Sequence, residues 1–140
     1  MIPKFRFFGR VADGEMRMVL AEAIDFTIGF VYYSYHDYTV EGDDNVYGDT
    51  VSFENCVIMQ STGLLDKNDK EIFESDIVEW EHKDTGQLVR GIIKYDTELG
   101  FWGMTDVRFN NLTAIGYLAN QRVTVLGNIY QNKELVEELK

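Results

Sequence analysis

The 140-residue sequence has one cysteine, one proline and two histidines. With Cys56 alone, no disulfide can form within the chain, and we expect a buried, inert thiol beside an apolar run. His36 and His82 lack partners at the spacing of a zinc motif, so we expect structural or exposed roles for both. No apolar run is long enough to cross a bilayer, and no signal-peptide core follows Met1. We therefore expect a cytoplasmic protein without a membrane partner.

Basic residues are also scarce, because 13 Lys and Arg face 24 Asp and Glu and leave a net charge of −11. Nucleic-acid-binding proteins carry a basic patch that neutralises phosphates, and anionic membrane surfaces attract basic segments. Nucleic acid is therefore an unlikely partner on charge alone. The simplest use of the acidity is solubility.

Catalytic and cofactor-binding motifs are missing as well. No Gly-x-Ser-x-Gly sequence surrounds Ser61, Thr62 or Ser75, and no glycine-rich phosphate loop follows an expected strand. A hydrolase needs a nucleophile beside a base, and no such pair stands out. We therefore expect no enzyme activity, no catalytic residue and no cofactor.

The acidic segment Val40–Thr50 is the strongest candidate for a cation site. A twelve-residue calcium loop starting at its first Asp pair would fill four allowed positions, which are Asp43, Asn45, Gly48 and Glu54. Tyr47 falls at position five, which needs a carboxylate or amide oxygen, and the flanking segments look like strands where the motif needs helices. We expect a solvated loop and no metal site, and cation binding by residues 41–49 is left open.

Aromatic residues are plentiful at 14%, with nine Phe and eight Tyr, and this content favours strands. In the N-terminal part we predict a hairpin over Lys4–Leu20 with Asp13-Gly14 at its turn. Phe26–Tyr38 is predicted to be extended, with a bulge or a close backbone approach at Gly29. Val51–Met59 is predicted to be a further strand. Together these segments predict an N-terminal antiparallel sheet.

In the C-terminal part, short apolar runs alternate with turn formers such as Gly86 and Gly100. They predict four strands, which are Ile77–His82, Leu88–Tyr95, Phe101–Met104 and Arg122–Tyr130, the last with a bulge at Gly127. Apolar residues at spacings of three and four predict a helix over Asn110–Gln121. A second short helix is expected to begin after Asn132, which is predicted to cap it.

The stretch Val57–Trp80 holds two apolar runs, separated by a break at Ser61-Thr62-Gly63 and a turn at Asp66–Glu71. It resembles the signature of the YopX-like family of phage and prophage proteins, and Ile2–Phe7 and Gly127–Asn132 resemble that family's opening and closing segments. The signature residues are Gln60, Thr62, Gly63, Leu64, Asp66, Lys67, Asn68, Lys70, Glu71, Ile72, Glu74, Asp76, Ile77, Val78, Gly127, Asn128, Ile129 and Tyr130. The sequence departs from the family at Asp69 and Ser75, where Gly is usual, and at Lys133, where Pro is usual.

The polar signature residues have two readings. Carboxylates such as Asp66, Glu74 and Asp76 could hold a metal or share a proton. They could instead bond to backbone amides and fix the path of the chain, and we favour this structural role. The resemblance, together with the short strands, implies a mainly β fold with an SH3-like small barrel over Asp76–Tyr130. The expected division is an N-terminal β region over 1–60 and the barrel region over 61–140, or one compact domain.

The resemblance names no reaction, so two function classes stay open. The first is a non-enzymatic module in the cytoplasm of a bacterial host that forms homo-oligomers or binds a phage or host protein. The alternative is a nucleic-acid-binding small barrel. In that alternative Tyr95, Phe101 and Trp102 would be the binding surface that stacks on bases, and Arg90, Lys94 and Arg108 would supply positive charge.

Overall fold

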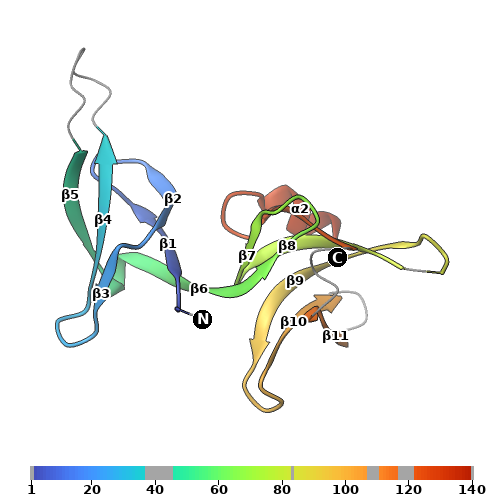
Figure 1. Ribbon diagram of the computed structural model, residues 1–140. Coiled ribbons are helices and arrows are strands. Elements are labelled where there is room, and N and C mark those ends of the chain that lie inside the picture. Colours follow the sequence, from blue (N-terminus) through green and yellow to red (C-terminus); the bar gives the residue numbers. More distant parts are fainter. Residues whose placement is uncertain (1, 37–45, 83, 107–110, 117–121, 140) are drawn as a thin grey trace. The chain divides into compact units, whose positions relative to one another are not determined.

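The computed structural model describes residues 2–36, 46–82, 84–106, 111–116 and 122–139 (Figure 1). The chain divides into two compact units, Lys4–Met59 and Gln60–Lys140, the second of which also includes Met1–Pro3. Strands dominate the described residues, and the one α-helix among them is short. The prediction of a mainly β fold is confirmed.

The unit Lys4–Met59 is built from antiparallel strands. They are β1 (Phe5–Arg10), β2 (Met16–Leu20), β3 (Ala23–Asp25), β4 (Phe30–His36), β5 (Val46–Ser52) and the start of β6 (Cys56–Leu65). The predicted hairpin is confirmed, because β1 pairs with β2 and Gly14 turns the chain between them with φ 83°. Figure 1 shows β4 between β3 and β5, in the strand order β3-β4-β5.

The predicted strand over Phe26–Tyr38 is only partly right. Its first four residues form the turn between β3 and β4, and residues 37 and 38 lie outside the described part of the chain. The side chain of Asp25 holds this turn, because its Oδ1 accepts hydrogen bonds from Thr27 N–H at 2.9 Å and Ile28 N–H at 3.2 Å. Gly29 closes it with φ 76°, so this glycine ends a turn and forms no bulge.

The predicted loop over Val40–Thr50 is wrong from residue 46 onward, and residues 40–45 lie outside the described residues. β5 pairs with β4 along its whole length, from Phe30 opposite Ser52 to His36 opposite Val46. Pairing with β4 explains the difference. The rings of Tyr35 in β4 and Tyr47 in β5 face each other across the two strands, with their centroids 5.7 Å apart. The predicted strand Val51–Met59 is interrupted by the 3-10 turn η1 (Phe53–Asn55).

A small core fills the interior of this unit. Phe7, Val31, Tyr33 and Val51 are buried together, and the rings of Phe7 and Tyr33 meet edge to face at 5.3 Å. Phe7 comes from β1, whereas the other three come from β4 and β5. The core therefore holds the β3-β4-β5 sheet against the β1–β2 hairpin.

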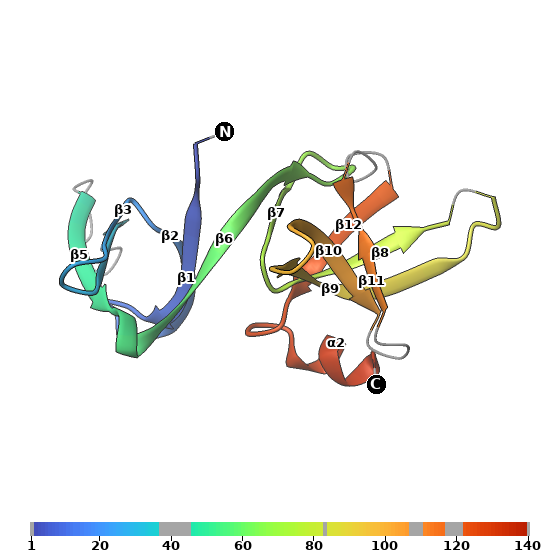
Figure 2. The ribbon, with the colours of Figure 1, turned by 90° about the horizontal axis from the view of Figure 1, so that it is seen from below.

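The unit Gln60–Lys140 contains a curled sheet with the strand order β11-β10-β9-β8-β12 (Figure 2). Its strands are β8 (Asp76–Glu81), β9 (Leu88–Asp96), β10 (Phe101–Asp106), β11 (Asn111–Ala114) and β12 (Val123–Asn128). All neighbouring pairs are antiparallel. The predicted strands over Ile77–His82, Leu88–Tyr95 and Phe101–Met104 are confirmed to within two residues. The SH3-like assignment stays a prediction.

The end of β6 and the short β7 (Glu71–Phe73) complete this unit, with α2 (Lys133–Glu138) near the C-terminus. The predicted break at Ser61-Thr62-Gly63 is wrong, since β6 runs through it. The register against β7 shifts between Ser61 and Leu65, and Gly63 has φ 78°. The glycine thus produces an irregularity within a strand and does not end it.

The predicted helix over Asn110–Gln121 is wrong at residues 111–114, which form β11, and residues 110 and 117–121 lie outside the described part. β11 pairs with β10, with Thr113 opposite Met104. Gly103 explains why a strand fits here. A Cβ added to Gly103 would lie 2.7 Å from Cδ1 of Leu112, so the bare glycine makes room for that side chain.

The predicted bulge in β12 is confirmed, because its register against β8 shifts between Val125 and Gly127. The helix after Asn132 is also confirmed, but the predicted side-chain cap is wrong. The Asn132 Oδ1 accepts a hydrogen bond from the Asn128 N–H at 3.0 Å instead. A Cβ at Gly127 would lie 2.2 Å from that oxygen, so the glycine at the bulge lets Asn132 reach the backbone.

Candidate functional site

The most buried carboxylate of the signature belongs to Asp66, which is 1% exposed. Its Oδ1 accepts hydrogen bonds from the N–H groups of Asn68 at 2.8 Å and Lys70 at 2.9 Å. Its Oδ2 accepts one from Val125 N–H at 2.9 Å. Burial raises the pKa of this carboxyl, but the bonds from the Val125, Lys70 and Asn68 amides outweigh burial and hold the pKa below its ordinary value. The ionised carboxylate therefore fastens the turn after β6 to β12.

Two other polar signature side chains also bond to backbone. Asp76 is buried, and its Oδ2 accepts a hydrogen bond from Phe73 N–H at 2.8 Å. The Thr62 hydroxyl donates to the Ile72 carbonyl at 2.7 Å and accepts from Leu64 N–H at 3.0 Å. These bonds connect β6, β7 and β8.

Within the described residues, no group of three or more His, Cys, Asp or Glu is placed to hold a metal ion.

Two other signature residues, Gln60 and Glu74, are joined by two hydrogen bonds. One is between backbone groups, and the other is between the Gln60 backbone and the Glu74 side chain. Glu74 N–H donates to the Gln60 carbonyl at 2.9 Å, and Gln60 N–H donates to Glu74 Oε1 at 3.4 Å. Ile72, Ile77 and Val78 are fully buried, and Leu64 packs against the cluster that contains Ile72 and Val78. The remaining members near the turn lie at the surface: Asn68 is exposed, Gly63 is exposed, and Glu71 is half-buried at the start of β7.

The fold brings the closing segment of the sequence to the central one. Ile129 N–H donates to the Ser75 carbonyl at 3.1 Å, and Ser75 N–H donates to the Ile93 carbonyl at 2.9 Å. Asn128 Oδ1 accepts from Tyr130 N–H at 3.1 Å and from Gln131 N–H. The closing segment thus meets the central one through the backbone hydrogen bond between Ile129 and Ser75.

The three aromatic residues considered as a binding surface do not share one face. Tyr95 and Trp102 are paired across β9 and β10, with ring centroids 5.1 Å apart. Phe101 lies on the opposite face of β10, since successive side chains of a strand alternate. Its ring would be 3.1 Å from a Cβ at Gly103, on the side of Leu112. The structure therefore brings together two of the three rings.

The cations considered for that surface are also dispersed. Arg90 is held by two carboxylates, with its Nε 2.9 Å from Glu79 Oε2 and its Nη1 3.4 Å from Glu138 Oε2. Lys94 is exposed on β9, and Arg108 lies outside the described residues. The charge of Arg90 is therefore already balanced by acids of β8 and α2.

An apolar turn is a feature that the sequence did not predict. Phe26 is 73% exposed and Ile28 is 58% exposed in the turn between β3 and β4. The Phe26 ring contacts the Phe53 ring at a centroid distance of 6.0 Å. Asp25 and Gly29, one at each end of the turn, are the sequence signal that could have revealed it.

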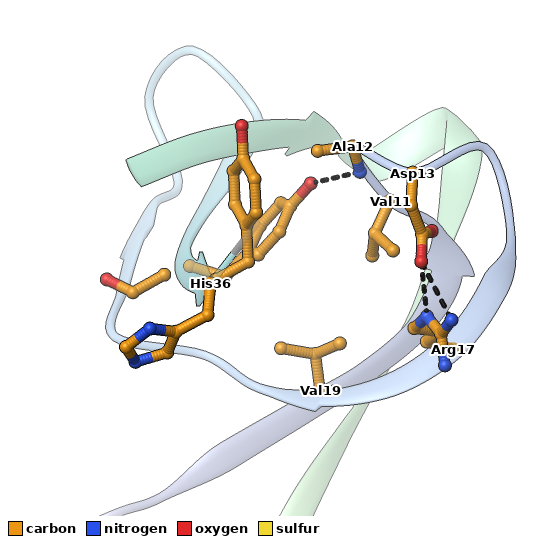
Figure 3. A pocket seen from close by; sticks show the side chains of 9 residues that line it. Val11, Ala12, Asp13, Arg17, Val19 and His36 are labelled. Atoms are coloured by element: carbon orange, nitrogen blue, oxygen red, sulfur yellow. Dashed lines mark hydrogen bonds and ion pairs between the residues drawn. The ribbon is translucent and has the colours of Figure 1, made fainter. Parts of the chain in front are cut away.

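A pocket in the unit Lys4–Met59 is the second feature that the sequence did not predict (Figure 3). Its volume is about 310 Å³, and its lining comes from β2, β4 and the β1–β2 connection. The lining residues are Val11, Ala12, Asp13, Arg17, Val19, Tyr33, Ser34, Tyr35 and His36. Asp13 and Arg17 form an ion pair on the right of the opening in Figure 3, and His36 lies on the left. The lining residues are distant in sequence, so no local motif indicates the pocket.

The isolated reactive groups have ordinary surroundings. Cys56 is half-buried rather than fully buried, and burial raises the pKa of its thiol. The His82 ring meets the Trp80 ring edge to face, with their centroids 5.4 Å apart.

Across the described residues, no helix is long and apolar enough to span a membrane.

Comparison with known proteins finds a similar solved structure and a matching family model. A crystal structure of protein EF1440 from Enterococcus faecalis is similar, with 26% sequence identity and a TM-score of 0.56 over 97% of this chain and 99% of that one. A search of the curated proteins finds no match. The family model described as YopX protein matches residues 4–137, nearly the whole length. This match confirms the resemblance found in the sequence, and the chain belongs to the YopX family.

Proposed function

We propose that this protein is a non-enzymatic module that binds protein, including further copies of itself, through the turn Phe26–Gly29. The observation that supports the proposal is the pair of large apolar side chains in that turn, Phe26 and Ile28, which are mostly in water. Contiguous apolar patches on a protein surface mark sites of interaction. A partner that covered both would remove their apolar surface from water.

The rigidity of the turn also supports the proposal. Gly29 N–H donates to the Asp25 carbonyl at 2.9 Å, and Phe53 N–H donates to the Gly29 carbonyl at 3.0 Å. With the two bonds to the Asp25 side chain, the backbone of the turn is held at both ends. A preorganised turn loses little conformational entropy when it binds, so more of the contact energy contributes to affinity.

The proposal covers origin and partner class as well. Membership of the YopX family and the acidic composition suit an accessory protein of a phage or prophage that acts in the bacterial cytoplasm. The partner would be a second copy or a phage or host protein. The net charge of −11 opposes self-association at low salt, and moderate salt screens it beyond about 8–10 Å.

Sedimentation velocity at moderate salt tests the proposal. We expect the wild type to form oligomers of the 16.2 kDa chain as its concentration rises, and the double variant F26S/I28S to remain monomeric. Leu99→Ser is the matched control, because Leu99 is an exposed apolar residue of another turn, between β9 and β10. A wild type that stays monomeric removes self-association, and an oligomer unchanged in F26S/I28S removes the turn as its interface.

The alternative of a nucleic-acid-binding barrel has weaker support. Arg90 is ion-paired, Phe101 faces away from Tyr95 and Trp102, and the chain is acidic overall. We expect no mobility shift of labelled single- or double-stranded DNA at micromolar protein. A shift that weakens steeply with salt would favour this alternative.

A further inference from the structure

The pocket of Figure 3 has the size and walls of a site for a small molecule. Its volume of about 310 Å³ is at the lower end of the range of about 300–1,000 Å³ found for ligand pockets. Val11 and Val19 supply aliphatic walls, and Tyr33 and Tyr35 supply aromatic ones, with ring centroids 6.2 Å apart. This space suits one aromatic ring with a short substituent.

The charged groups at the opening balance each other. Arg17 binds one oxygen of Asp13 twice, with its Nε at 2.9 Å and its Nη2 at 2.7 Å from Oδ2. The other oxygen of Asp13 accepts a hydrogen bond from Glu15 N–H at 3.0 Å. The hydrogen bond from Arg17 also lowers the pKa of Asp13, so the pair remains ionised at neutral pH. The pair offers no net charge to a ligand.

Hydrogen-bond donors nevertheless remain at the opening. A guanidinium has five N–H groups in a planar fork, and Arg17 directs only its Nε and Nη2 at Asp13. Its side chain is 55% exposed, so its Nη1 can reach a ligand. The hydroxyl of the buried Tyr33 is already engaged, since it accepts from Ala12 N–H at 2.9 Å and donates to Asp49 Oδ2 at 3.4 Å. Arg17 is therefore a donor available for an acceptor on the ligand.

We infer that this pocket binds an uncharged aromatic molecule that carries a carbonyl acceptor, with the ring against Val11, Val19 and Tyr35 and the carbonyl at Arg17. An anionic ligand would meet a cation that Asp13 already neutralises, within a chain of net charge −11. A cationic ligand would face the remaining N–H groups of Arg17. The neutral ligand is the one whose charge and hydrogen-bonding pattern match the site.

Three probes that share one ring test this inference: benzamide is neutral, benzoate is anionic and benzylamine is cationic at pH 7. We expect benzamide to shift the backbone amide signals of residues 11–19 and 33–36 in ¹H–¹⁵N spectra, with a dissociation constant on the order of 1 mM for so small a ligand. The other two probes should bind at least about tenfold more weakly, which corresponds to about 1.4 kcal/mol. Absence of shifts in these segments with benzamide, or equal binding of all three probes, would overturn the inference.

The variant Asp13→Asn provides a sharper test, because it removes the balancing charge and keeps an oxygen that can accept from Glu15 N–H. We expect it to reverse the preference, so that benzoate binds more tightly than benzamide. Asp96→Asn is the matched control, because Asp96 accepts from Glu98 and Leu99 N–H groups in a turn of the other unit. An unchanged preference in Asp13→Asn, or a reversal in Asp96→Asn, would contradict the role given to the ion pair.

A variant that fills the pocket gives a third readout. Val19→Phe places a ring in the space that the ligand would occupy, and we expect it to abolish the benzamide-induced shifts. Where that variant fails to fold, the milder Val19→Leu should still weaken benzamide binding. Undiminished binding in a folded Val19→Phe or Val19→Leu protein would show that benzamide binds elsewhere.

Discussion

The carboxylate of Asp66 accepts a hydrogen bond from the backbone N–H of Val125, 2.9 Å away although the two residues are 59 positions apart. The same carboxylate closes the turn between β6 and β7 through Asn68 and Lys70. One side chain thus fixes a local turn and a long-range contact. The position of Asp66 in the signature thus matches the backbone N–H groups that its carboxylate binds.

Replacement of Asp66 by Asn should destabilise the unit Gln60–Lys140. Asn retains one acceptor, but its amide nitrogen would face a backbone N–H, either in the turn or at Val125. Loss of a bond to a charged group and an unsatisfied buried N–H predict a decrease of about 2–3 kcal/mol in the free energy of unfolding. Urea denaturation followed by tryptophan fluorescence measures it, since Trp80 and Trp102 both lie in this unit.

The control for that variant is Asp84→Asn, which removes one negative charge from an exposed turn residue. We expect it to change the free energy of unfolding by less than about 0.5 kcal/mol. If Asp66→Asn and Asp84→Asn had the same effect, the hydrogen bonds of Asp66 would contribute nothing measurable to stability.

Acid should weaken the contribution of Asp66. Its pKa in the folded protein lies below the ordinary value, so the unfolded chain takes up the proton first as the pH falls. The stabilisation is fully present above the unfolded pKa of about 3.9 and is lost as the pH falls through the lower folded pKa. We expect the difference in unfolding free energy between wild type and Asp66→Asn to shrink below about pH 4. A difference that stays constant from pH 7 to pH 3 would refute this linkage.

Local signals in the sequence predicted much of the fold. Asp13-Gly14 marked the first hairpin, and Gly86 marked the turn between β8 and β9. The sequence failed where a neighbour decides the structure. The segment Asn110–Gln121 has a helical spacing of apolar side chains, but its residues 111–114 pair with β10, where Gly103 leaves room for Leu112. Tertiary pairing overrides local propensity in this segment.

The candidate sites were harder to predict than the fold. The pocket needs Val11 and Val19 from one hairpin and Tyr33 from β4, which only the folded unit brings together. The apolar turn was missed for a different reason. Phe26 and Ile28 are residue types that favour strands, so the segment was predicted to be a strand. Asp25 and Gly29 instead form a turn there.

Metal ions should leave the stability of the protein unchanged. A ligand that binds only the folded state raises the melting temperature, and the described residues contain no cluster of three or more metal ligands. We expect the same melting temperature with millimolar calcium, magnesium or zinc as with EDTA. An increase of several degrees with one ion would show a site, and loss of that increase in Asp43→Asn would assign it to residues 41–49.

Glycine at position 75 should stabilise the protein. Asp69 and Ser75 are the residues other than glycine for which the described chain has positive φ, at 64° and 71°. They are also the two positions at which this sequence departs from a Gly expected from the family signature. A left-handed conformation costs a residue with a Cβ about 1–2 kcal/mol, and the greater freedom of glycine in the unfolded chain offsets about 0.5–1 kcal/mol of the gain.

We therefore expect Ser75→Gly to raise the free energy of unfolding by about 0.5–1 kcal/mol, measured by urea denaturation. The contacts of Ser75 that hold neighbouring strands use its N–H and carbonyl groups, and Gly retains both. Ser75→Ala is the matched control, because Ala keeps the Cβ and so keeps the strain. If Ala stabilised the protein as much as Gly, loss of the hydroxyl would explain the gain, and the left-handed backbone at Ser75 would carry no measurable strain.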